Sequence, residues 1–160
     1  LFDREDLSFP FCEHAVAVND AMPRVSLKRL EIMLGGLQGK RIALFGVSYR
    51  QDVGDTRYSP SETFFHAAVE KGAVVKAHDP MVVKWTELGL DLDPELPVAS
   101  SIDAAVFAVP HQEYREMDIV SWTNGAKPVV LDANNVLSPK QCEKLRSVGC
   151  NVQSIGIGEQ

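Results

Sequence analysis

Short apolar runs alternate with more polar segments over most of the chain. Five runs are nearly continuous and rich in β-branched residues, which is typical of strands buried on both faces; they cover residues 42–47, 74–78, 104–109, 128–132 and 152–157. Between them we expect helices at 61–71, 82–88, 112–121 and 139–148. Residues 90–101 fit neither pattern well, and a short edge strand is expected at 97–99.

This alternation predicts one α/β unit. Strands that alternate with helices imply right-handed βαβ crossovers, and therefore a Rossmann-like, doubly wound parallel sheet. The 160 residues, 45% of them hydrophobic, can build one ordinary core rather than two.

A separate helical pattern precedes the sheet. Apolar residues recur at helical intervals over residues 11–34, where Pro23 interrupts the pattern and Gly35 and Gly36 end it. We expect residues 1–36 to form a long helical arm or connector and residues 37–160 to form the α/β domain, because the α/β pattern is complete without the helix. The alternative is that this helix packs on its own sheet.

The loop after the first strand carries a dense set of side chains suited to ligand binding. They are Tyr49, Arg50, Asp52, Asp55, Thr56 and Arg57. Ligands of open α/β sheets bind beyond the carboxyl ends of the strands. Guanidinium groups make forked bonds to phosphate oxygens, and an aromatic ring can stack on a base. The loop therefore predicts a flat anionic ligand such as a nucleotide diphosphate. The alternative is that both arginines only pair with the two aspartates.

Three further loops should meet this one at the same edge of the sheet. They begin near Asp79, Pro110 and Asp132, and they carry His111 and Asn134. Because the sequence lacks the G-x-G-x-x-G fingerprint of dinucleotide binding, Asp79 is expected to serve a turn or a cap rather than a ribose. His111 could touch the ligand, but a lone loop histidine is more often solvated, and we expect the latter. Asn134 fits either a turn or a contact to a sugar or phosphate.

The start of the helix after the first loop is well marked. Ser59 is expected to accept a hydrogen bond from the third helical N–H, Pro60 fits the first helical position, and Glu62 can complete a capping box. These residues are mainly structural, and they also direct the positive end of the helix toward the ligand edge.

Charge and cysteine content narrow the range of partners. The net charge of −6 argues against nonspecific nucleic-acid binding, which needs a positive field. No apolar run approaches the ~20 residues of a membrane helix, and no signal peptide is visible, so we expect a cytoplasmic protein with no membrane partner. Cys12, Cys142 and Cys150 lack metal-ligand spacing and are expected to be free thiols without a catalytic role.

Four segments resemble a known family. G-V-S-Y-R-Q-D-V-G-D-T-R-Y-S-P (46–60) and E-K-G-A-V-V-K-A-H-D-P (70–80) resemble the C-terminal UDP-binding domain of the UDP-glucose/GDP-mannose dehydrogenases. V-N-D-A-M-P-R (18–24) is similar to the end of their central dimerisation helix, and V-L-D-A-N-N-V-L (130–137) is similar to a late loop of the family. The resemblance extends over residues 16–157.

The resemblance implies a part of a larger enzyme. Members of the family oxidise the C6 alcohol of a nucleotide sugar to a carboxylate with two NAD⁺, using a cysteine in a G-G-S-C-type motif upstream of the central helix. This sequence contains no such motif. We therefore expect it to be the substrate-nucleotide-binding C-terminal part of an NAD-dependent nucleotide-sugar 6-dehydrogenase, a homodimer in its full-length form. The alternative is a stand-alone nucleotide-binding or regulatory module without activity.

The resemblance also implies roles for single residues. Tyr49 and Arg50 match the pair that holds the nucleotide of the UDP-sugar substrate, and Asn134 stands near an arginine that many members place against that substrate. Arg57 matches an arginine that reaches across to NAD on the N-terminal domain. Arg50 replaces a lysine and keeps its charge with a different reach, whereas Asn134 lacks the arginine charge. Both departures leave the identity of the sugar open.

Overall fold

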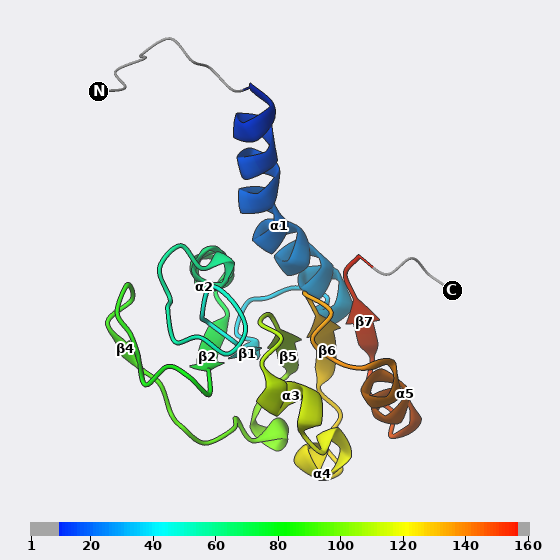
Figure 1. Ribbon diagram of the computed structural model, residues 1–160. Helices are drawn as coiled ribbons and strands as arrows, with labels where there is room; N and C mark the ends of the chain where they lie inside the picture. Colours follow the sequence, from blue (N-terminus) through cyan, green and yellow to red (C-terminus); the bar gives the residue numbers. More distant parts are fainter. Residues whose placement is uncertain (1–9, 157–160) are drawn as a thin grey trace, which may run out of the picture.

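The protein is described here by a computed structural model that covers residues 10–156, without the side chains of residues 10–13, 15–17, 19 and 20 (Figure 1). Within this range, five parallel strands form a sheet in the order β2-β1-β5-β6-β7. They are β1 (Arg41–Phe45), β2 (Val74–His78), β5 (Ala104–Phe107), β6 (Val129–Asp132) and β7 (Val152–Ser154). Each overlaps one of the five apolar runs, so the predicted parallel sheet is confirmed.

Helices cover both faces of this sheet. They are α1 (Pro10–Leu34), α2 (Pro60–Glu70), α3 (Gln112–Glu116), α4 (Ile119–Thr123) and α5 (Pro139–Ser147). Successive residues of a strand point to opposite faces. Accordingly, Ile42 and Leu44 of β1 pack in one apolar cluster with residues of α1 and α2, whereas Ala43 and Phe45 pack in another with residues of α3, α4 and α5. The predicted doubly wound arrangement is therefore confirmed.

Helix α1 has two different parts. Leu27 and Leu30 are buried in the same core cluster as residues of α2. The Glu31 carboxylate accepts hydrogen bonds from Lys71 Nζ at 2.9 Å. Toward its N-terminus the helix projects away from the sheet (Figure 1), and Val18 and Val25 are half exposed. The C-terminal part of α1 thus packs with α2 over the sheet.

Three local predictions were wrong. In place of a helix at 82–88, β3 (Lys84–Trp85) pairs antiparallel with β4 (Leu90–Asp91), because Trp85 is fully buried against Phe65 and the chain turns at Gly89. In place of an edge strand at 97–99, a 3₁₀ helix, η1, covers Ala99–Ser101. The helix expected at 112–121 is two helices, since the Asp118 side chain accepts from the Ser121 N–H and starts α4 anew.

The sheet order creates a topological switch point. Strand β1 has β2 on one side and β5 on the other. The chain leaves β1 toward α2 on one face and leaves β5 toward α3 on the opposite face. Gly46 permits the close approach of the two strand ends: it has φ +95°, and a Cβ there would lie 2.5 Å from the Cβ of Val109. Such a point is where open α/β sheets bind ligands.

No helix in residues 10–156 is long and apolar enough to cross a membrane. The last part of the predicted strand 152–157 ends at Ser154, and residue 157 lies outside the described range.

Candidate functional site

A cavity of about 250 Å³ lies at the switch point, and we refer to it as the edge cavity. Five segments of the chain line it: the loop after β1, the start of α2, the ends of β5 and β6, and α1. The predicted convergence of the loops at the ends of β1, β5 and β6 is therefore confirmed. The contribution of α1, through Met22, Pro23 and Ser26, was missed, because the path of the helix over the sheet edge cannot be derived from its own periodicity.

Three of the four predicted site residues line the edge cavity. Tyr49 and Arg50 come from the loop after β1, and Asn134 comes from the end of β6. Tyr49 is 59% exposed, so its ring face is accessible. The Asn134 Nδ2 donates to the Ala108 carbonyl at 3.0 Å, which fixes the amide at the cavity wall. Arg57 is not among the lining residues.

The two loop arginines differ in their partners. Arg57 makes a forked pair with Asp55, with Nη2–Oδ2 at 2.7 Å and Nε–Oδ1 at 2.9 Å. The hydrogen bonds from Arg57 lower the pKa of Asp55 to about 2. Within the side chains that the structure describes, no carboxylate forms an ion pair with Arg50. The ion-pair alternative therefore holds for Arg57 only, and the Arg50 charge remains available at the cavity.

Asp79 anchors the first part of the binding loop. Its buried Oδ2 accepts from the N–H groups of Val47 at 2.8 Å and Ser48 at 2.9 Å, and its Oδ1 accepts from the Met81 N–H at 2.9 Å. The predicted turn role is confirmed, and the carboxylate also fixes the end of β1. Burial alone would raise the pKa of Asp79, but hydrogen bonds from His111 and these N–H groups outweigh burial and lower it.

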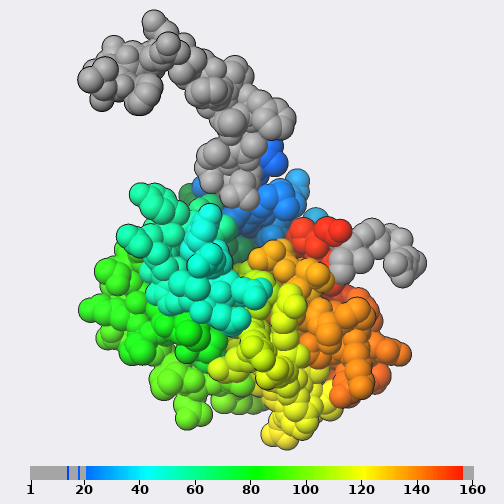
Figure 2. Space-filling model, viewed as in Figure 1, coloured from blue at the N-terminus to red at the C-terminus, as the bar shows by residue number. Residues whose placement is uncertain are grey.

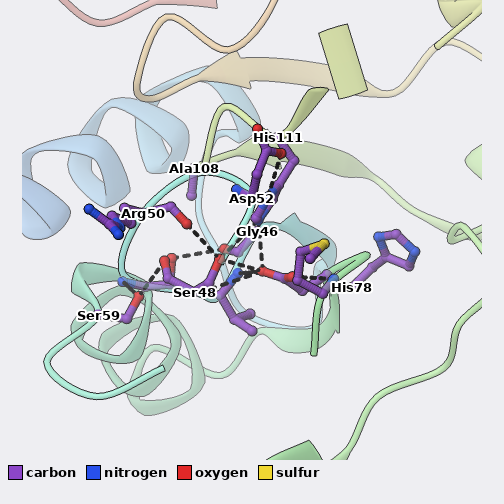
Figure 3. Close-up of polar contacts among 12 residues, drawn as sticks. Gly46, Ser48, Arg50, Asp52, Ser59, His78, Ala108 and His111 are labelled. Atoms are coloured by element: carbon purple, nitrogen blue, oxygen red, sulfur yellow. Dashed lines mark hydrogen bonds and ion pairs between the residues drawn. The ribbon is translucent and has the colours of Figure 1, made fainter. Parts of the chain in front are cut away.

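His111 was wrongly predicted to be solvated, since its side chain is fully buried. Its Nδ1 accepts from the Asp52 N–H at 2.9 Å, so in the neutral ring the proton lies on Nε2. Nε2 lies 2.9 Å from Ser48 Oγ and 3.1 Å from Asp79 Oδ2. In Figure 3 these side chains form one cluster, and the Arg50 side chain points away from it. The burial of the His111 side chain could not be predicted from the sequence, because its partners come from two segments that are distant along the chain.

This cluster is not a nucleophilic triad. In such triads the carboxylate binds Nδ1–H and the serine binds Nε2, whereas here both Asp79 and Ser48 contact Nε2. Ser48 is also completely buried. The arrangement can fix a loop and has no accessible nucleophile.

The two cysteines whose side chains are described offer no reactive group at the site either. Cys142 and Cys150 are buried, and burial raises the pKa of both thiols. The side chain of Cys12 lies outside the described residues. Among the side chains that are described, no group of three or more His, Cys, Asp or Glu could hold a metal ion.

The start of α2 is bonded to the binding loop. The Ser59 Oγ accepts from the second helical N–H, that of Ser61 at 3.3 Å, rather than from the third as predicted. Ser61 Oγ donates to the Gly46 carbonyl at 2.9 Å. The Glu62 side chain does not complete the predicted box; its Oε1 lies 3.8 Å from His66 Nε2, one helical turn along α2. Pro60 is the first helical residue as predicted and, with Ser61, lines the edge cavity beside the positive helix end.

A doubly wound sheet with a cavity, an available arginine and an exposed aromatic ring at its switch point defines a nucleotide-binding type of α/β domain. Residues 43–139, more than half of the chain, match the UDP-glucose/GDP-mannose dehydrogenase family, UDP binding domain. The chain belongs to this family.

Individual relatives agree with this assignment. The chain is similar to a UDP-glucose 6-dehydrogenase of Rickettsia bellii, with 27% identity over 152 residues that cover 90% of this chain and 34% of that protein. It is 30% identical to a UDP-N-acetyl-D-mannosamine dehydrogenase of Methanocaldococcus jannaschii over 146 residues, which cover 89% of this chain and 33% of that protein. The chain spans about a third of the length of the curated relatives that it matches.

A solved structure shows the same fold. The crystal structure of NDP-N-acetyl-D-galactosaminuronic acid dehydrogenase from Methanosarcina mazei matches with a TM-score of 0.79 and 27% identity, over 98% of this chain and 34% of that chain.

Proposed function

We propose that this chain is the substrate-nucleotide-binding domain of an NAD-dependent nucleotide-sugar 6-dehydrogenase and that it binds the UDP moiety in the edge cavity. One observation carries the proposal: Tyr49 and Arg50, which the resemblance matches to the pair that holds the nucleotide, line that cavity together with Asn134, which stands near an arginine position of many members. Arg50 can make forked, charge-assisted bonds to a diphosphate. Tyr49 offers a ring face to the base or a hydroxyl group to the ribose.

The size of the edge cavity supports a partial site. Its 250 Å³ is below the roughly 300–1,000 Å³ of whole ligand pockets, so it can enclose part of a nucleotide sugar. The chain covers about a third of its relatives, and we propose that the remaining part of a longer protein binds the sugar and NAD. In this proposal Arg57 faces NAD, and the segment of residues 1–36, of which residues 1–9 lie outside the described range, belongs to the end of the helix through which a cytoplasmic enzyme forms a homodimer.

Binding of UDP by the purified chain tests this function. A partial site with a few charge-assisted contacts predicts a Kd of roughly 0.1–1 mM. AMP should bind more weakly, because we expect the cavity to take a uracil nucleotide. Calorimetry or chemical-shift titration with both nucleotides measures the difference. Equal binding of AMP and UDP would contradict the proposal.

Two variants of the same loop give a matched comparison. Arg50→Ala should weaken UDP binding about 10- to 100-fold, because losing a charge-assisted contact to phosphate costs about 1.5–3 kcal/mol. Arg57→Ala removes the same charge from a position outside the cavity lining and should leave the UDP affinity of this chain unchanged. Equal effects of the two variants would show that the loop attracts anions only through its general charge.

A further inference from the structure

The loop segment between Ser48 and Asp52, which carries Tyr49 and Arg50, is fixed at both ends. At its far end, Asp52 adopts φ +56°, a conformation that is uncommon for any residue except glycine. The Asp52 N–H donates to His111 Nδ1 at 2.9 Å, and the Asp52 Oδ1 accepts from the Gln112 N–H at 3.1 Å. We call these two bonds the Asp52 link. They attach the loop to the start of α3.

His111 also contacts the near end of the segment. Its Nε2 lies 2.9 Å from Ser48 Oγ and 3.1 Å from Asp79 Oδ2, and that carboxylate accepts from the Ser48 N–H. One buried imidazole therefore bonds to both ends of the segment. Figure 2 shows the consequence for the surface, where the cyan segment after β1 lies beside the yellow segment around residues 110–120.

The ring itself does not line the edge cavity. The ring can act on a ligand through the loop that it bonds. Ordering a free loop during binding lowers affinity, whereas a loop that is ordered in advance avoids this loss. Tyr49 and Arg50 belong to such a loop and line the cavity.

We propose that His111 is a positioning residue for nucleotide binding, acting through the Asp52 link to hold Tyr49 and Arg50 at the edge cavity before a nucleoside diphosphate arrives. This inference rests on the proposed function, because it concerns the same cavity. It assigns a binding role to a side chain that does not touch the ligand and to the unusual backbone conformation of Asp52.

Two substitutions separate the loop contact from the burial of the ring. In His111→Asn, the amide oxygen can stand where Nδ1 accepts from the Asp52 N–H. In His111→Gln, the amide nitrogen can stand where Nε2–H meets Asp79, but the loop-facing acceptor is lost. UDP affinity should stay within about threefold of wild type in His111→Asn and fall about tenfold in His111→Gln. The reverse order would overturn the proposal, because it would show that only the contact with Asp79 matters.

A second pair of variants leaves the buried ring intact. Asp52→Gly keeps the positive φ but removes the carboxylate from the Gln112 N–H, and it should weaken UDP binding severalfold. Asp52→Asn keeps an acceptor and tolerates the same φ, so it should bind as wild type does. If Asp52→Gly binds UDP as tightly as Asp52→Asn, the bond from the Gln112 N–H to the Asp52 carboxylate does not position the site, and that half of the proposal is overturned. Both variants keep the bond from the Asp52 N–H to His111, so this comparison tests the Gln112 bond even where a His111 variant does not fold.

Amide exchange without nucleotide separates failure of this inference from failure of the proposed function. The Asp52 amide should exchange slowly in wild type and in His111→Asn, and faster in His111→Gln. Fast Asp52 exchange in His111→Gln together with unchanged UDP affinity would overturn the positioning role while the cavity still binds nucleotide. Absence of UDP binding by the wild-type chain would overturn the proposed function, and the positioning role with it.

Discussion

Arg50 and Arg57 lie in the same loop and carry the same positive charge, but their surroundings differ. The Arg50 charge lies at the edge cavity, whereas Arg57 forms its forked pair with Asp55. That pair is largely exposed, with side-chain exposures of 75% and 40%. Exposed ion pairs contribute little to stability. Arg57 can therefore leave Asp55 and bind a phosphate group with only a small loss of folding free energy.

The proposed contact of Arg57 with NAD⁺ is testable in a longer protein that contains this chain. Because losing a charge-assisted phosphate contact costs about 1.5–3 kcal/mol, Arg57→Ala should raise the KM for NAD⁺ about 10- to 100-fold and leave the KM for the nucleotide sugar nearly unchanged. Steady-state kinetics with each substrate varied in turn measures this split.

Arg41 supplies the control, because it makes a similar exposed pair with Asp103 at the opposite end of β1. Arg41→Ala should alter neither KM. If Arg57→Ala leaves NAD⁺ kinetics intact, Arg57 is only the ion-pair partner of Asp55.

At the scale of elements, the sequence predicted what depends on local pattern. The five strands followed from β-branched runs, and the start of α2 followed from Pro60. The failures depend on distant partners or competing caps. Trp85 turns its segment into a strand by packing on α2, and Asp118 starts a new helix within a continuous helical pattern.

In the candidate site, too, some residues could be predicted from local sequence and others depend on distant partners. Tyr49, Arg50 and Asn134 could be selected because their loops begin at the ends of parallel strands. The roles of His111 and of α1 could not, because the bonding of His111 requires Asp52 and Asp79 to be brought together by the fold. Residue type therefore predicts candidate ligand-contacting residues more readily than the residues that hold them in position.

The link between β2 and α3 predicts a dependence of stability on pH. At the end of β2, His78 Nδ1 lies 2.8 Å from the Tyr114 hydroxyl group of α3, and Nε2 lies 3.3 Å from the Pro94 carbonyl. Burial lowers the pKa of His78 below its usual 6.5, although the Pro94 carbonyl and nearby acidic groups oppose this shift.

The native state therefore binds fewer protons at His78 than the unfolded state does. Its contribution to stability is complete above about pH 6.5 and is lost as the pH falls from there toward the lowered folded-state pKa, with a slope of at most about 1.4 kcal/mol per pH unit. Thermal unfolding from pH 8 to pH 5 should show this decline, and His78→Gln should make it shallower. A decline in His78→Gln as steep as that of wild type would instead place the linkage elsewhere.

At the scale of the whole molecule, one sheet edge organises the chain. The middle of α1, the loop after β1, the start of α2 and the ends of β5 and β6 all meet at the edge cavity. The β3–β4 hairpin and α5 contribute no lining residue. The family match covers the segments from β1 to the start of α5, so it includes the cavity-lining residues that follow α1.

The central claim is that the edge cavity holds the UDP moiety, and mapping the amide shifts of the isotope-labelled chain during a UDP titration tests it most directly. We predict saturable shifts at Tyr49, Arg50 and Asn134, together with residues of α1 near Ser26, and negligible shifts in the β3–β4 hairpin. Saturable shifts that cluster away from the sheet edge, for example in the groove between α1 and α2 that Arg24, Lys28 and Lys71 line, would contradict the account.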